Sequence, residues 1–343
     1  MQGSSHPVSD LQALNTLALP AQVACYRKIL SPDELPRLDL PAGPRFILGG
    51  GSNLVLTGDI DGCVLHMGIR GRKWIAEDAE AWYVQAGAGE SWHDFVQWTL
   101  ANHWPGLENL SLIPGTVGAA PIQNIGAYGA EVADFLHGLM AWDFGARRWR
   151  AFSRADCAFS YRHSVFKQEG WHLSGEMAIT HVTFRLPKQW QANTGYADVL
   201  QALASRNCTT PDARAIAEAV IAVRQQKLPD PAELPNAGSF FQNPVLPAMQ
   251  VEALRREFSG LPCYPQPDGR IKVAAGWLIE QAGWKGRQLG PAGMYARQAL
   301  VLVNHGGAKG EDVLRLMRAV QADVMARFSI RLEPEPIFWP VMG

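Results

Sequence analysis

The amino-acid sequence predicts an α+β fold. Between residues 45 and 67, short apolar runs are separated by the turn sequences Gly49-Gly-Gly-Ser-Asn53 and Asp59-Ile-Asp-Gly62, which is typical of strands joined by tight turns. Residues 311–328 instead repeat apolar side chains every three or four positions, the spacing of one helix face. Helical and strand-like segments alternate without a regular βαβ order, which favours α+β over a doubly wound sheet.

Local signals place the other elements. Ser91 is a good N-cap for a helix that ends near Ala101, and Thr210 followed by Pro211 predicts a second helix that ends near Gln226. Further strands are expected at residues 177–186, 299–303 and 330–339. A cluster of prolines at residues 228–238 interrupts this pattern, and we expect a domain to begin there. With 343 residues, of which 47% are hydrophobic, the chain is long enough for two or three domains.

Charge and composition exclude several classes of protein. The formal net charge of -1 gives no general electrostatic attraction for nucleic acid or an anionic membrane surface. No apolar run reaches the length of about 18 residues that a membrane span needs, and residues 1–10 lack the pattern of a secretory signal. We therefore expect a cytoplasmic protein that binds neither nucleic acid nor membranes. A monomer is the expected oligomeric state, although the sequence does not determine it.

The five cysteines are scattered along the chain, without a CxxC pair. We expect them to be reduced thiols, most of which serve as packing groups. Neither they nor the nine histidines have the spacing of metal ligands, so no metal site is predicted.

The most informative segment is glycine-rich and runs from Pro114 to Gly129. It contains four glycines and almost no charge, so its backbone can approach a diphosphate closely and offer amide N–H groups to it. A tight loop between buried elements explains the same composition. The chain contains neither GxGxxG nor a Walker sequence, which excludes the usual nucleotide loops, and residues 49–53 form a second small, donor-rich turn directly after a strand.

These two segments, in their order along the chain, resemble the flavin-binding segments of the UDP-N-acetylenolpyruvoylglucosamine reductase family. The likeness extends over nearly the whole chain: Gly51-Ser-Asn, Gly106-Leu-Glu-Asn, Tyr161-Arg162, Lys227-Leu-Pro-Asp-Pro, Asn236-Ala-Gly-Ser-Phe-Phe-Gln-Asn-Pro244, Ala274-Ala-Gly-Trp-Leu-Ile279 and Leu332-Glu-Pro-Glu335. The resemblance implies three domains, two of which form an FAD-binding scaffold of the vanillyl-alcohol-oxidase/MurB type that is not a Rossmann fold. Their expected bounds are 1–72 plus 329–343 and 73–228, with a third, α+β substrate-binding domain at 229–328.

The resemblance further implies FAD as cofactor and NADPH as reductant. The residues that match the family's FAD-binding positions are Gly49, Gly50, Gly51, Ser52, Asn53, Pro114, Gly115, Thr116, Gly118, Ala119, Ile122, Gln123, Asn124, Gly126, Ala127 and Tyr128. In the family's reaction, a cytoplasmic step of peptidoglycan synthesis, UDP-N-acetylglucosamine enolpyruvate is reduced to UDP-N-acetylmuramate. Hydride passes from NADPH to the flavin and from the flavin N5 to the vinyl carbon of the substrate.

Three residues match the family's catalytic positions. Hydride addition leaves carbanion character that must spread into a carboxylate, and the Arg162 guanidinium suits a carboxylate because it is planar and stays charged. Glu335 is implied to help stabilise this enolate-like species, although Glu333 would face the same way in a strand. Ser239 is implied to donate the proton, since a strongly basic carbon needs only a weak, well-placed acid. A surface ion pair, a solvated strand end and a turn serine are the alternative interpretations of these three residues.

Four polar residues match the family's substrate-binding positions, and they are Tyr196, Lys227, Asn243 and Gln298. The chain also departs from the family. After Glu335 it reads Pro336-Ile-Phe-Trp-Pro340, where the family has a basic residue and soon a glycine, and Leu17-Ala18 replaces a bulky residue followed by glycine. How Glu335 is held is therefore open at this stage.

Two other functions remain possible from the sequence. One is a different FAD-dependent oxidase or dehydrogenase on the same scaffold, and the other is a catalytically silent protein that binds a flavin or a nucleotide sugar. The presence of Arg162, Ser239 and Glu335 argues against the silent protein, and Tyr196 with Lys227 argues against the other oxidoreductase.

Overall fold

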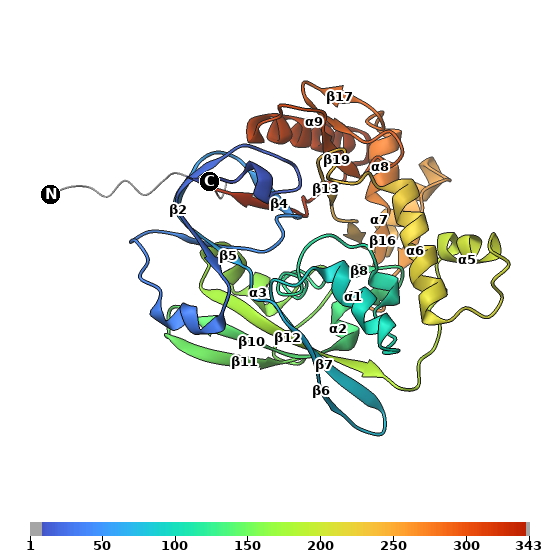
Figure 1. Ribbon diagram of the computed structural model, residues 1–343. Coiled ribbons are helices and arrows are strands. Elements are labelled where there is room, and N and C mark those ends of the chain that lie inside the picture. The colour runs from blue at the N-terminus through green and yellow to red at the C-terminus, as the bar shows by residue number, and fades with distance from the viewer. Residues whose placement is uncertain (1–8, 341–343) are drawn as a thin grey trace. The chain divides into compact units, whose positions relative to one another are not determined.

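The computed structural model describes residues 9–340 and contains two compact units (Figure 1). The first comprises Val23–Gly51 and Ile60–Gln226, and the second comprises Asp10–Gln22, Ser52–Asp59 and the chain from Lys227 onwards. The chain therefore enters the second unit three times. A two-residue strand, β1 (Ser9–Asp10), begins the described part of the chain.

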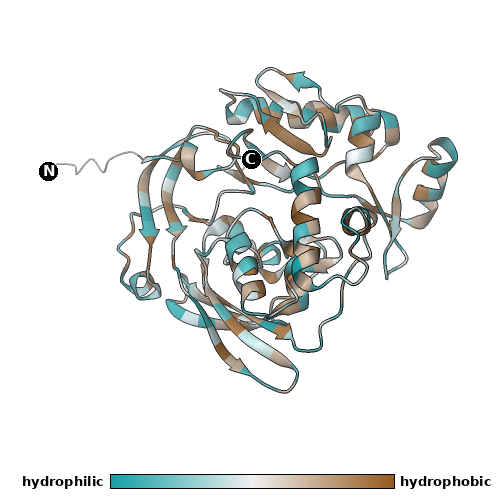
Figure 2. Ribbon diagram, turned by 45° about the vertical axis from the view of Figure 1, so that its right-hand side comes forward, coloured by the Kyte–Doolittle hydropathy of each residue, from teal (hydrophilic) through white to brown (hydrophobic). Residues whose placement is uncertain are grey.

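The first unit contains two larger sheets. In one, β5 (Ile60–Met67) lies between β2 (Gln22–Ile29) and β3 (Arg45–Leu48), and both pairings are parallel. The other is antiparallel, with the strands in the order β11 (Arg148–Ser153), β10 (Leu136–Asp143), β12 (Met177–Pro187), β7 (Ala81–Gly87) and β6 (Arg72–Glu77). Hydrophobic and hydrophilic residues alternate along the strands at the bottom of Figure 2, as expected of a sheet with one buried face.

Aromatic side chains fix the first α-helix of the first unit on the antiparallel sheet. In α1 (Trp92–Ala101), Trp92 and Phe95 are fully buried and contact Phe184 of β12 at ring distances of 5.8 and 5.0 Å. Such aromatic burial contributes about 2–3 kcal/mol for each side chain, so it fixes α1 firmly on the sheet. The unit's other helices and small elements are η2 (Pro32–Arg37), η3 (Glu108–Leu110), β8 (Gly126–Ala127), β9 (Ala130–Glu131), α2 (Val132–Phe135), α3 (Val165–Gln168), α4 (Trp171–Ser174), α5 (Ala197–Ala204) and α6 (Ala213–Lys227).

The second unit is built on an antiparallel sheet in the order β13 (Asn236–Ser239), β19 (Val301–Asn304), β18 (Ala292–Met294) and β17 (Gln288–Leu289). The long helix α9 (Gly310–Phe328) contributes a buried apolar stripe that includes Val313, Val320 and Val324. A parallel pair joins β4 (Leu54–Leu56) to β20 (Ile337–Trp339), from the two ends of the sequence. The remaining elements are η1 (Gln12–Leu14), β14 (Val245–Leu246), α7 (Ala248–Glu257), β15 (Cys263–Pro265), β16 (Ile271–Val273) and α8 (Ala275–Gln281).

Most predicted elements are confirmed, and two need correction. Ser91 caps α1 as expected, because its Oγ accepts from the amide of Asp94 at 3.3 Å. The predicted helix start at Pro211 is wrong: α6 begins at Ala213, since Asp212 Oδ1 accepts from Ala215 N at 2.7 Å and supplies the cap. The predicted strand at residues 330–339 is wrong in its first part. Within this range, Ile337–Trp339 pairs as a strand and Pro334 forms an isolated bridge with Phe241. Pro336, between them, has no amide hydrogen to donate.

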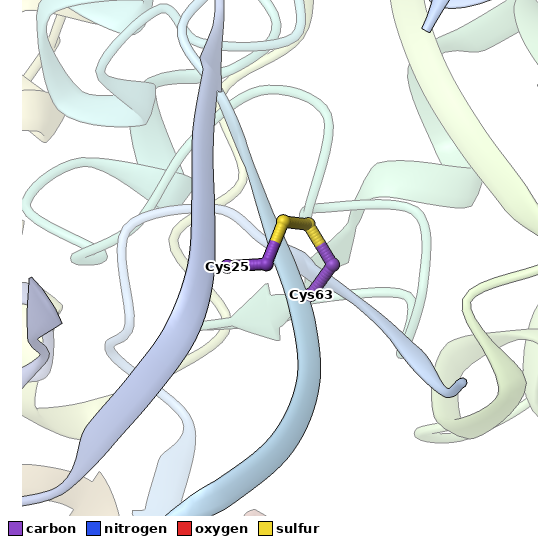
Figure 3. The surroundings of a disulfide bond; sticks show 2 residues. All are labelled: Cys25 and Cys63. Carbon is purple, nitrogen blue, oxygen red and sulfur yellow. A yellow bond between two sulfur atoms is a disulfide. The ribbon is translucent and has the colours of Figure 1, made fainter. Parts of the chain in front are cut away.

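The cysteine prediction also needs correction. Cys25 of β2 and Cys63 of β5 are register partners on neighbouring parallel strands, with a Cα–Cα distance of 4.4 Å, and they form a disulfide (Figure 3). The other three, Cys157, Cys208 and Cys263, are free thiols as predicted. Burial raises the pKa of the Cys157 thiol to about 12, so this side chain is an inert packing group.

Candidate active site

The first half of the glycine-rich segment is held by the residues that lead into α1. The amides of Gly118 and Val117 donate to the carbonyls of Ala88 and Glu90, both at 2.9 Å. In the opposite direction, the Trp92 amide donates to the Gly115 carbonyl at 3.1 Å. These three hydrogen bonds to the backbone of residues 88–92 hold residues 115–118 in one conformation.

Three glycines are required where this segment meets its neighbours within the first unit. A Cβ atom on Gly118 would lie 2.5 Å from Ala88 Cβ, and one on Gly50 would lie 2.9 Å from Gly115 Cα. A Cβ on Gly49 would lie 2.7 Å from Thr116 Oγ1. The glycine turn at residues 49–51 and the segment at residues 115–118 therefore lie side by side, so close that a side chain on Gly49 or Gly50 has no room.

This arrangement fits the FAD that the sequence predicts. Two bare backbone segments face each other with few charged side chains, which suits a diphosphate held by amide donors. In addition, the Thr116 hydroxyl is buried and makes no hydrogen bond within residues 9–340. A buried hydroxyl without a partner is costly, and a ligand oxygen would satisfy it.

Asn124, another predicted FAD residue, is buried and uses its whole side chain inside the protein. Its Oδ1 accepts from the Ala133 amide at 2.9 Å, and its Nδ2 donates to Glu131 Oε2 at 2.6 Å and to the Ser160 carbonyl at 3.2 Å. These bonds fix the turn that follows residue 121. The side chain of Asn124 therefore holds the segment's own shape.

Arg162 lies at the tip of a tight turn, where Ser160 and His163 exchange backbone hydrogen bonds at 3.0 and 3.1 Å. Its backbone is left-handed, with φ of +54°, which costs on the order of 1 kcal/mol for a residue with a side chain. The guanidinium donates to the carbonyl of Gly126 at 3.2 Å. Arg162 therefore contacts the glycine-rich segment through Gly126.

Tyr196 also contacts the glycine-rich segment, at Tyr128. Its ring, 43% exposed, meets the ring of Tyr128 edge to face at a centroid distance of 5.8 Å, and burial raises the pKa of Tyr128. The loop before Tyr196 is tied down by Asn193, whose Nδ2 donates to the Gly129 carbonyl at 3.0 Å.

A second tie on this loop was not predicted from the sequence. The Glu108 carboxylate is 2% exposed and accepts from Trp190 Nε1 and from the Gly106 amide, both at 2.6 Å. Burial raises the pKa of this carboxyl. Next to it, Asn109 Nδ2 donates to the carbonyls of Tyr128 and Asn193, at 2.8 and 2.9 Å. The motif Gly106-Leu-Glu-Asn was noticed in the sequence, but no spacing rule connects it to Trp190.

In the second unit, backbone pairing brings Ser239 and Glu335 into the same neighbourhood. Ser239 ends β13 and is exposed, and the carbonyl of the next residue, Phe240, accepts from the Glu335 amide at 2.8 Å. One step further along, Phe241 and Pro334 form a β-bridge. The proton donor and the acid predicted from the sequence therefore lie on paired segments.

The structure also separates the two glutamates that the sequence left as alternatives. The side chain of Glu333 is 61% exposed and forms an ion pair with Arg331 at 3.2 Å, whereas Glu335 is only partly exposed. Asn53 Nδ2 donates to the Glu335 carbonyl at 3.3 Å, so the backbone of Glu335 is held on both sides. Among the unusual residues after Glu335, Ile337 begins β20, and its amide donates to the carbonyl of the same Asn53 at 2.9 Å.

The remaining predicted substrate residues have different positions. Lys227 is the last residue of α6. Asn243 Oδ1 accepts from the Ala275 amide at 2.9 Å at the start of α8, and Gln298 Oε1 would lie 3.1 Å from a Cβ on Gly276 of the same helix. Asn243 and Gln298 thus both lie near the start of α8 within the second unit.

Two kinds of feature are absent from residues 9–340. No helix is long and apolar enough to cross a membrane, and no cluster of three histidine, cysteine, aspartate or glutamate side chains could hold a metal ion.

Two family models match separate parts of the chain. Residues 43–146 match the model of an FAD binding domain, and residues 230–339 match the UDP-N-acetylenolpyruvoylglucosamine reductase C-terminal domain. These matches confirm the predicted FAD-binding scaffold and α+β fold.

Full-length relatives carry the same family name. The chain is 64% identical over 329 residues to the UDP-N-acetylenolpyruvoylglucosamine reductase of Dechloromonas aromatica, covering 96% of this chain and 98% of the relative. It is 56% identical over 338 residues to that of Azoarcus sp., covering 96% of each. Among solved structures, the enzyme from Thermus caldophilus is 25% identical, with a TM-score of 0.65 over 97% of this chain and 99% of the other. Identity at this level over nearly the whole length makes the chain a member of the UDP-N-acetylenolpyruvoylglucosamine reductase family.

Proposed function

We propose that this chain carries out the reaction of its family with Arg162, Ser239 and Glu335 as catalytic residues. As a member of that family it is an FAD-dependent oxidoreductase, a UDP-N-acetylmuramate dehydrogenase that uses NADPH and acts in peptidoglycan precursor synthesis. The observation that carries the residue assignment is the backbone pairing of residues 240 and 335, which keeps Ser239 near Glu335.

Each proposed catalytic residue has a distinct role in the reaction. FAD, when bound, supplies the hydride that NADPH provides. Arg162 binds the carboxylate of the enolpyruvyl group and stabilises the negative charge that develops on it during the reaction. Its fixed, left-handed backbone and its bond to the Gly126 carbonyl hold the guanidinium in place before substrate arrives.

Ser239 donates the proton that completes the lactyl ether. Serine is a weak acid, but a carbanionic carbon is basic enough to take its proton when the hydroxyl is well placed. Its exposed position at the end of β13 leaves the hydroxyl accessible to a substrate. Glu335 assists by stabilising the enolate-like intermediate and orienting the donor.

The binding residues follow the same assignment. FAD is held by the two glycine segments, residues 49–53 and 114–128, and Thr116 Oγ1 donates to or accepts from it. The sugar nucleotide is bound by Tyr196, Lys227, Asn243 and Gln298, with Lys227 as a point charge for the diphosphate. We further propose three domains, at residues 1–72 plus 329–343, 73–228 and 229–328, and a cytoplasmic monomer that needs no metal, nucleic acid or membrane.

The test separates the two half-reactions. The purified protein is reduced anaerobically with NADPH, and enolpyruvyl-UDP-N-acetylglucosamine is then added while flavin absorbance is followed. Rapid reoxidation by the sugar supports the function, and reoxidation by oxygen without any response to the sugar would indicate an oxidase. A protein that takes up no FAD would contradict the whole proposal.

Ser239→Ala tests the residue assignment. It should leave flavin reduction by NADPH nearly unchanged and slow the sugar half-reaction by about 100-fold or more, the usual contribution of a general acid. Ser205→Ala, at the exposed end of α5, is the matched control. Equal loss of both half-reactions in Ser239→Ala would exclude its role as proton donor.

A further inference from the structure

The backbone of Leu112, two residues before the glycine-rich segment, is left-handed, with φ of +59°. A residue with a side chain such as leucine rarely adopts this conformation, and it persists only where the surroundings hold it. Leu112 directs the chain into Pro114 and Gly115. Its conformation therefore decides how the first residues of the flavin segment are presented.

Side chains from two helices hold Leu112 at its two backbone polar groups. The Leu112 amide donates to His93 Nδ1 at 3.0 Å, and its carbonyl accepts from Arg224 Nε at 3.3 Å. His93 lies in the first turn of α1 and Arg224 near the end of α6. Both residues belong to the first unit, as does Leu112.

The other groups that hold residues 110–118 by hydrogen bonds do not gain or lose a proton near neutral pH. Trp92 Nε1 donates to the Leu110 carbonyl at 2.9 Å, and the bonds at Gly115, Val117 and Gly118 are between backbone groups. Arg224 keeps its charge at any physiological pH. His93 differs, because its Nδ1 can accept the Leu112 hydrogen only while the ring is neutral and carries its proton on Nε2.

The surroundings of His93 favour this neutral form. Burial lowers the pKa of His93, the positive charge of Arg224 lowers it further, and Asp94 opposes them by raising it. These are the charged groups that act on the ring from α1 and α6. A protonated ring would point an N–H group at the Leu112 amide and lose this bond.

We propose that His93 is a positioning residue for FAD: in its neutral form it fixes Leu112 and so presents residues 114–116 to the cofactor. Acidification then weakens FAD binding through a single protonation. The direction of the pH dependence follows from the lowered pKa of His93. Because the pKa is lowered while Leu112 is held, the stabilisation is fully present above the ordinary histidine value of 6.5 and is lost as the pH falls through the lowered pKa.

Release of FAD from the purified holoenzyme tests this proposal. The rise in flavin fluorescence on dilution gives an FAD dissociation constant between about pH 5 and about pH 8, the range in which histidines titrate. The wild type should bind FAD more weakly at acid pH. His93→Leu removes the acceptor and should bind about 3- to 10-fold more weakly even at pH 8, the effect of one hydrogen bond.

His93→Asn decides between positioning and general support of the fold. Its amide oxygen can accept the Leu112 hydrogen but does not titrate, so it should bind FAD within about 2-fold of the wild type at pH 8 and lose the acid weakening. His103→Asn, an exposed histidine just beyond α1, should keep the wild-type pH profile. An acid weakening in His93→Asn equal to that of the wild type, or wild-type affinity in a folded His93→Leu at pH 8, would overturn the proposal.

Discussion

The side-chain amide of Asn53 donates to the backbone carbonyl of Glu335 across 282 residues of sequence. On its other side, the Glu335 amide donates to the carbonyl of Phe240, the residue after Ser239. The position of Glu335 is thus set by its backbone. The atypical tail takes part in this arrangement, because the Ile337 amide donates to the Asn53 carbonyl at 2.9 Å and so holds the asparagine that binds Glu335.

Glu335→Gln should therefore leave the fold intact while removing the charge of the side chain. We expect flavin reduction by NADPH to stay near the wild-type rate and reoxidation by the sugar to slow by about 100-fold or more. Stopped-flow absorbance measures both steps. Glu333→Gln, whose parent side chain pairs with Arg331 at the surface, is the control and should differ from the wild type by less than about 2-fold. Similar effects of the two changes would mean that the acid has been assigned to the wrong position.

Gly50→Ala should weaken FAD binding. The new methyl group would lie 2.9 Å from Gly115 Cα, and backbone cannot move aside as a side chain can. Such overpacking costs about 1–3 kcal/mol, which we expect to appear as a lower FAD content after purification. The absorbance ratio of flavin to protein measures it. Gly58→Ala is the control, because a methyl group there meets nothing within 4 Å; a full FAD load in Gly50→Ala would show that the two segments do not meet as described.

Trp190→Phe should loosen the loop that carries Tyr196. The change leaves the buried Glu108 carboxylate with one donor fewer, at a cost of about 1–3 kcal/mol. We expect a lower melting temperature and a higher KM for the sugar, with flavin reduction by NADPH unchanged. Trp74→Phe, on the exposed strand β6, serves as control. An unchanged KM in the presence of clear destabilisation would limit Glu108 and Trp190 to a structural role.

Removing the disulfide should lower stability without altering the chemistry. In the chain-entropy account, a bond between residues 38 positions apart contributes up to about 4 kcal/mol, so Cys25→Ser/Cys63→Ser should unfold at a lower denaturant concentration than the wild type. Thiol titration of the unfolded, unreduced wild type should find three free thiols, and five after reduction. Five thiols before reduction would contradict the bond. Cys208→Ser, a half-buried free thiol, is the control for the substitution itself.

Capping residues and apolar periodicity in the sequence predicted individual helices and strands. The capping serine and the one-sided apolar pattern of α1 depend only on neighbours within a few residues, and both were found as expected. The start of α6 was missed by two residues because Thr210 and Asp212 are both good caps, and which of them is used depends on packing. Resemblance to a family supplied the candidate residues, which no local pattern selects.

The features that could not be predicted from the sequence depend on contacts between segments that are far apart along the chain. The Cys25–Cys63 bond requires that β2 and β5 be neighbours in register, and nothing in the cysteine spacing encodes that. His93 and Leu112 lie 19 residues apart, and their bond needs a left-handed leucine that propensities disfavour. Such features arise when tertiary contacts outweigh local preference.

The pairing of β4 with β20 has a consequence for how the protein is made. Residues 54–56 leave the ribosome early, but their strand partner, residues 337–339, is among the last to be synthesised. At about 5–20 residues per second, β4 waits on the order of half a minute for β20. During that time its edge is open to wrong pairing, so a stalled or shortened chain that ends before Ile337 is expected to become a target for chaperones and proteases.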